Sequence, residues 1–100
     1  MQATERTIVV MRRLFRQADH RVVEDLLVRE CGANLALTDL WGEAQFERLW
    51  LAAMKLSAGD VARLRKEIAL AQTDWRDVLM AAGFGTSLEA HRQWADSLKT

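Results

Sequence analysis

Residues 39–56, DLWGEAQFERLWLAAMKL, are the stretch of the chain that decides its fold. On a helical wheel their apolar side chains cover about half of the circumference, which is wide for one helix. The members of this face are Phe46, Leu49, Trp50, Ala53, Met54 and Leu56. A helix with so wide an apolar face is expected at the centre of a bundle. Leu51 falls outside the face, among charged side chains.

Two short amphipathic helices are expected before this segment. The first begins at Thr4, whose hydroxyl suits the N-cap position. Its apolar stripe consists of Ile8, Met11, Leu14, Phe15 and Ala18. The second spans residues 19–31 and ends at Gly32, which we expect in the left-handed conformation. In the connector that follows, we expect Leu35 and Leu37 to be buried.

Further helices are expected after the central segment. Ser57 is predicted to end the central helix and to cap the next one. The core stripe of that next helix consists of Val61, Leu64, Ile68 and Ala71. Thr86 and Glu89 have the spacing of a capping box, so they predict the start of the last helix.

Residues 74–85, DWRDVLMAAGFG, combine acids, an arginine, a tryptophan and two glycines, and could be taken for a functional motif. Each of these residues also suits one short helix. Thr73 or Asp74 is the expected N-cap, and Gly83 suits the left-handed position that ends many helices. Phe84 would then be the C″ residue, and its ring is expected to contact Leu79. We therefore interpret this stretch as a helix with its start and stop signals.

These patterns predict an all-α protein, a compact bundle of about five or six short helices around a longer central helix at residues 39–56. The chain has no proline and no segment of sustained alternation, which argues against strands. Its length suits one domain, so residues 1–100 are expected to form a single helical domain. No apolar run approaches the length of a membrane span. The single cysteine fits a reducing compartment, and we expect a cytoplasmic protein.

The residue types used in catalysis and metal binding do not converge in this sequence. His20 and Glu24 are four residues apart, but no second pair completes a metal site, and His91 has only Glu89 nearby. Both histidines are therefore expected at the surface. Cys31 lies at a helix C-terminus, where the negative end of the dipole raises the pKa of a thiol. We predict no catalytic residue, no cofactor and no metal.

The tryptophans divide into two pairs. Trp50 and Trp75 lie on apolar stripes and are expected in the core. Trp41 precedes a glycine near a helix start, and Trp94 lies in the last helix, so these two are expected to be partly exposed. Tryptophan is enriched at protein interfaces, although core packing is its more common role.

Apolar residues outside the predicted core indicate a protein-interaction function. Leu51 and Leu70 lie on the polar faces of adjacent helices, and Val9 and Val10 lie off the stripe of the first helix. Contiguous exposed apolar residues often mark association surfaces. We predict a non-enzymatic interaction or adaptor module that binds a protein partner, or a second copy as a homodimer, through Leu51, Leu70, Trp94, Val9 and Val10.

The alternative is a nucleic-acid-binding regulator. The chain is neutral overall, but residues 1–21 carry a net charge of +3 and residues 22–50 a net charge of −4. One face of the first helix presents Arg6, Arg12, Arg13 and Arg16, which could contact phosphates. Domains that bind nucleic acid are usually basic as a whole, so this alternative is the less favoured one.

Overall fold

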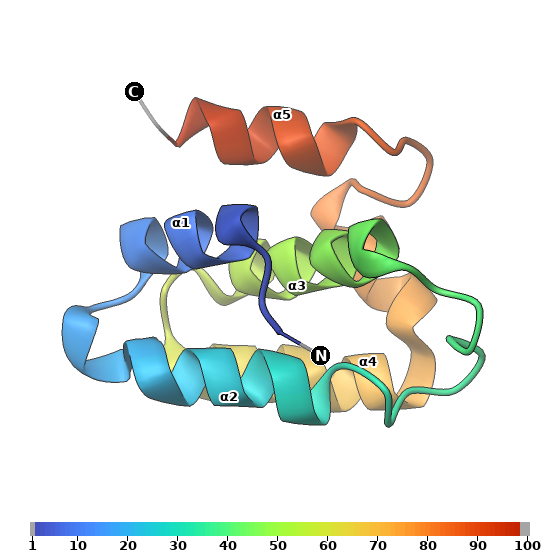
Figure 1. Ribbon diagram of the computed structural model, residues 1–100, viewed down its shortest axis with the longest axis horizontal. Helices are drawn as coiled ribbons and strands as arrows, with labels where there is room; N and C mark the ends of the chain where they lie inside the picture. Colours follow the sequence, from blue (N-terminus) through green and yellow to red (C-terminus); the bar gives the residue numbers. More distant parts are fainter. Residues whose placement is uncertain (1, 99–100) are drawn as a thin grey trace.

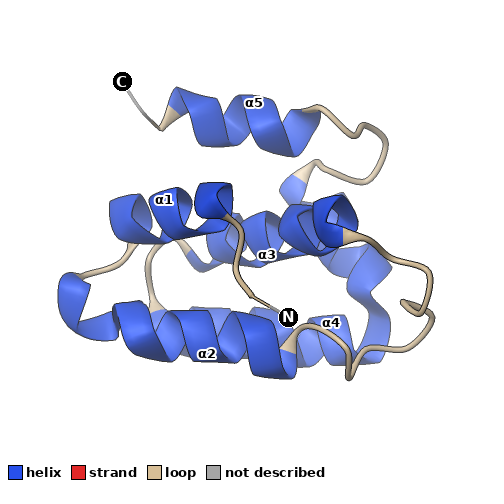
Figure 2. Cartoon of the chain, in the orientation of Figure 1, coloured by secondary structure: helices blue, strands red, loops and turns tan. Residues whose placement is uncertain are grey.

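The computed structural model describes residues 2–98, and within them it is all-helical, as the sequence predicts (Figure 2). Five α-helices and one short 3₁₀ helix account for the regular structure of this part of the chain. In chain order they are α1 (Glu5–Leu14), η1 (Gln17–Asp19), α2 (His20–Glu30), α3 (Glu43–Ser57), α4 (Val61–Ala82) and α5 (Ala90–Ser97). No helix within residues 2–98 is long and apolar enough to span a lipid bilayer.

The helices form three layers with α3 in the middle one (Figure 1). α2 and α4 make one layer, α1 and α3 make the next, and α5 lies above them. α3 packs against α4, α1 and α5, which explains its wide apolar face. It is the predicted central helix, but α4 is longer, with 22 residues against 15. α3 begins at Glu43 because Gly42 is extended and donates its N–H to the Gln45 side chain.

Leu51 and Val10 lie in the core, and the expectation that they are off the buried faces is wrong. Leu51 is 0% exposed and Val10 is 1% exposed. Leu51 stands among charged residues in the sequence, but α3 is covered from several sides, so even its neighbour Glu47 is buried. In α1 the buried face is rotated to Thr7, Val10 and Met11.

The end of α2 differs from the prediction. Gly32 does not take a left-handed conformation; a positive φ occurs at Leu37 instead. Side chains satisfy the last carbonyl groups of α2, since Trp50 Nε1 donates to the carbonyl of Cys31 and Gln72 Nε2 donates to that of Glu30. A glycine C-cap is therefore not required. In the connector Leu35 is buried as expected, whereas Leu37 is 81% exposed.

The predicted stop signal of residues 74–85 is confirmed, but the predicted start does not begin a separate helix. Asp74 leaves the helical conformation (φ −156°, ψ 97°) and accepts the N–H of Arg76, so the predicted helix start is a kink inside α4. Gly83 has a φ of 82°, and the N–H of Phe84 donates to the carbonyl of Leu79. That bond and the one from Gly83 to Met80 are those of a Schellman motif.

Two other predicted caps are wrong. Ser57 does not cap α4; the left-handed Ala58 ends α3, and Asp60 accepts the N–H of Arg63 at the start of α4. The Thr86–Glu89 capping box is absent as well. α5 begins at Ala90, and the N–H of Glu89 donates to the side chain of Ser87.

Candidate functional site

The five residues predicted as an interface do not form one exposed patch. Leu51 and Val10 are buried in the core and are not accessible to a partner. Val9 and Trp94 are half-buried, and the centroids of the Trp94 and Phe84 rings are 5.9 Å apart. Of the five, Leu70 alone is exposed, with 40% of its surface accessible to solvent.

Among the most exposed apolar side chains, one belongs to the loop before α3 and one to the second half of α4. Leu40 is 98% exposed and Met80 is 63% exposed. Trp75 Nε1 donates to the carbonyl of Ala36 across 2.8 Å, and this bond fixes the loop against α4. In Figure 1 the loop and the kinked half of α4 lie together at the right-hand end of the molecule.

A groove of about 300 Å³ opens between these segments. We call it the tryptophan groove; its lining is Trp41, Gln45, Arg48, Trp75, Arg76, Leu79, Met80 and Gly85. The Trp41 and Trp75 rings meet edge to face with centroids 4.6 Å apart. Trp41 also contacts the ring of the core residue Phe46, with centroids 5.2 Å apart. The groove wall is therefore continuous with the hydrophobic core.

The local fold of α4 places the far side of the groove. The kink at Asp74 redirects the helix, and the Schellman motif at Gly83 turns the chain back toward α3. The carbonyl of Phe84 then accepts a hydrogen bond from Arg48 Nε at 2.8 Å. A Cβ at position 85 would overlap the Met80 side chain, so Gly85 permits the close approach of chain and methionine.

The polar lining of the groove consists mainly of donors. Burial lowers the pKa of the Arg48 guanidinium, and no carboxylate of residues 2–98 forms an ion pair with it. Arg76 is paired with Asp74, with Nε 3.0 Å from Oδ1. Gln45 uses its side-chain oxygen on the N–H of Gly42, which leaves its amide nitrogen as a donor.

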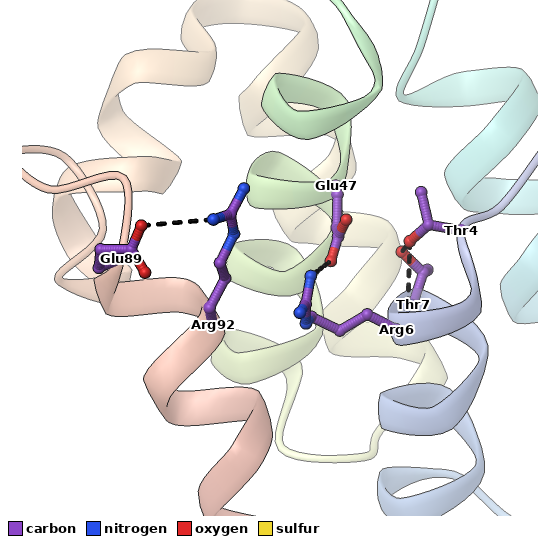
Figure 3. A network of polar contacts seen from close by, with 6 residues as sticks. All are labelled: Thr4, Arg6, Thr7, Glu47, Glu89 and Arg92. Atoms are coloured by element: carbon purple, nitrogen blue, oxygen red, sulfur yellow. Dashed lines mark hydrogen bonds and ion pairs between the residues drawn. The ribbon is translucent and has the colours of Figure 1, made fainter.

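A second polar cluster lies where α1, α3 and α5 meet (Figure 3). Arg6 reaches from α1 to the buried Glu47 of α3, with Nη1 2.8 Å from Oε1. This hydrogen bond raises the pKa of Arg6. Thr4 caps α1 and its hydroxyl lies 2.7 Å from that of Thr7. Because the charges of Arg6 and Glu47 balance, we interpret the cluster as a structural link between α1 and α3.

His91 is buried, and the expectation of a surface position for it is wrong. The side chain is 1% exposed, and neither ring nitrogen has a hydrogen-bond partner in residues 2–98. The centroids of the His91 and Phe84 rings are 6.2 Å apart. Burial lowers the pKa of His91, and the nearby Glu47 opposes this effect. The other histidine, His20, is half-buried with its Nε2 2.9 Å from the carbonyl of Phe15.

The arginines of the nucleic-acid alternative do not form one free basic face. Arg6 is engaged by Glu47, and Arg16 lies 3.5 Å from the carboxylate of Asp19. Arg12 and Arg13, near the end of α1, are exposed and form no ion pair with residues 2–98.

The groove could be anticipated only in part. Trp41 and Trp94 are half-buried, as expected, and Trp50 is in the core, but Trp75 is half-buried against expectation. Met80 lies off the apolar stripe of its helix, and this position was the sequence signal that could have indicated an exposed apolar residue at the groove.

No side-chain chemistry for catalysis is visible at Cys31. The thiol is 0% exposed, and burial raises its pKa to about 12. Across residues 2–98, no three His, Cys, Asp or Glu side chains are grouped so that they could hold a metal ion. Comparison of the chain with protein-family models, with curated proteins and with solved structures finds no significant match.

Proposed function

We propose that this protein is a non-enzymatic interaction module that binds an apolar segment of a partner protein in the tryptophan groove. The observation that carries the proposal is exposed Met80 in the lining of a groove walled by Trp41 and Trp75, with the exposed Leu40 next to Trp41 in the chain. Exposed apolar side chains grouped beside a concave surface are typical of binding sites.

The groove has the size and composition of a site for one large side chain. Its volume of about 300 Å³ lies at the lower end of the usual range for binding pockets. Burying an exposed leucine or methionine stabilises a complex by about 1.5–3 kcal/mol. Tryptophan is among the residues that contribute most to interface affinity.

The groove is also held in place before any partner binds. The Trp75 indole is fixed by the carbonyl of Ala36, and Arg48 is fixed by that of Phe84. Binding to a site that is already ordered costs less conformational entropy. A cytoplasmic location is part of this proposal, because the chain has one cysteine and that cysteine is buried.

A random dodecapeptide phage library tests the proposal. The library is selected in parallel on the full chain and on Met80→Glu, which places a charge at the groove. We expect peptides with large apolar residues to be enriched on the wild-type chain and to lose binding to Met80→Glu. Leu70→Glu is the matched control, since it adds the same charge to another exposed residue of α4. Circular dichroism confirms that both variants fold.

Two outcomes contradict the proposal. One is that no peptide is enriched, or that enriched peptides bind Met80→Glu as well as the wild type. The other comes from analytical ultracentrifugation of the same proteins. A wild-type dimer that dissociates in Met80→Glu would identify a second copy of this chain as the occupant of the groove.

A further inference from the structure

We infer that the tryptophan groove selects a partner segment in which an aspartate or glutamate lies close to the apolar anchor, and that Arg48 binds this carboxylate. The inference rests on the proposed function. It adds the chemistry of the partner, since the apolar wall alone would accept any large hydrophobic side chain.

The first argument is the set of donors that Arg48 keeps free. Its Nε donates to the carbonyl of Phe84, and neither Nη group has a hydrogen-bond partner within residues 2–98. The Nη atoms are not among the buried polar atoms that lack a partner, so they are accessible from outside. A guanidinium fixed at Nε and open at its Nη groups can present paired N–H donors to a carboxylate.

The second argument comes from comparing three arginines of the same molecule. Arg6 has Glu47 and Arg76 has Asp74, and in both cases the hydrogen bond with the carboxylate raises the pKa of the arginine. Arg48 is half-buried without any such partner, and burial lowers its pKa. A partly desolvated cation without a counter-ion is stabilised when a ligand supplies the missing anion.

The third argument is the charge of the lining. Arg48 and Arg76 are its only ionisable side chains, and no acid is among the lining residues. Asp74 offsets Arg76 from just outside the lining, so the uncompensated charge is that of Arg48. The free amide nitrogen of Gln45 adds a neutral donor. This arrangement attracts a carboxylate and disfavours a lysine or arginine at the same position.

The position of Arg48 sets the spacing of the recognised motif. Arg48 lines the same groove as Trp41, Trp75 and Met80. The carboxylate and the apolar anchor of the partner must therefore be close together, on residues adjacent or nearly adjacent in an extended segment.

The test uses the same dodecapeptide library with Arg48→Gln as a third target. We expect wild-type selection to enrich aspartate or glutamate next to the apolar residue, and selection on Arg48→Gln to keep the apolar residue and lose the acid. The most enriched peptide is then synthesised in two forms, one with glutamine in place of its acidic residue. Because a hydrogen bond to a charged group contributes about 1.5–3 kcal/mol, the wild-type chain should prefer the acidic form at least about tenfold.

The ratio of the two affinities separates recognition from structure. Arg48 also holds the carbonyl of Phe84, so Arg48→Gln could weaken both peptides by loosening the groove. Loosening alone would leave the tenfold preference intact, whereas loss of carboxylate binding brings the ratio close to one. Arg48→Lys, which keeps the cation, should restore part of the preference. Peptides that require Met80 but show no preference for an acid overturn this inference alone; the absence of any Met80-dependent peptide overturns the proposed function.

Discussion

Replacement of Leu51 by alanine tests the burial of α3 directly. Leu51 is 0% exposed, so the substitution removes Cγ and both Cδ atoms from the core. At about 0.8 kcal/mol for each carbon, the lost transfer free energy is about 2.4 kcal/mol. The core around α3 closes such a space only in part, and the cavity raises the expected loss of unfolding free energy to about 3–4 kcal/mol. That is a large fraction of the stability of a domain of this size.

Leu70→Ala is the matched control, because it makes the same chemical change on the neighbouring helix. Leu70 is 40% exposed, and solvent can fill the space that the substitution leaves. We therefore expect a loss of about 1–1.5 kcal/mol. Both values are measured by urea unfolding followed by circular dichroism, with the dependence on denaturant unchanged. Equally small losses for both variants would place Leu51 at the surface, as its charged neighbours in the sequence indicate, and would refute the packing around α3.

Three further predictions concern a turn, a buried ring and the alternative function. Gly83→Ala should lower the unfolding free energy by about 1 kcal/mol, because position 83 has a positive φ. Gly59→Ala should lower it by about 2–4 kcal/mol, because a Cβ there would also collide with the backbone carbonyl of Leu14 at the end of α1. Equal melting temperatures for the two variants would contradict this prediction. Because burial lowers the pKa of His91, its contribution to stability is complete above about pH 6.5 and is lost as the pH falls below that value. Relative to His91→Phe, the unfolding free energy of the wild type in urea should fall by at most about 1.4 kcal/mol per pH unit. Parallel plots of unfolding free energy against pH for the two proteins would refute this. Fluorescence anisotropy with duplex DNA at low salt should show no binding; salt-sensitive binding that disappears when Arg12 and Arg13 become glutamine would favour the nucleic-acid alternative.

Features that depend on a few neighbouring residues could be predicted from the sequence. Thr4 caps α1 by accepting the N–H of Thr7, and Gly83 ends α4 in the expected left-handed conformation. Asp74, one of the two expected N-caps, interrupts the helical conformation of α4. Each of these interactions joins residues no more than one or two helical turns apart, so the chemistry of the local sequence is sufficient to specify it.

Burial could not be predicted in the same way. Leu51 and Leu70 have similar charged surroundings in the sequence, yet one lies in the core and the other is 40% exposed. The difference arises because α3 is in the middle layer and α4 is in an outer one. Leu37 is a second example, since it was expected to be buried with Leu35 but is 81% exposed.

The sequence by itself determined that the described part of the chain is helical, that α1 starts after Thr4 and α4 ends before Gly83, and that the predicted segment 39–56 holds most of the central helix α3. Only the tertiary structure decided which sides of those helices face solvent, and it alone assembled the tryptophan groove. The hydrogen bond from Trp75 to Ala36 joins residues 39 positions apart, and that from Arg48 to Phe84 joins residues 36 apart. Contacts over such separations depend on how the layers stack, because no local pattern brings those residues together.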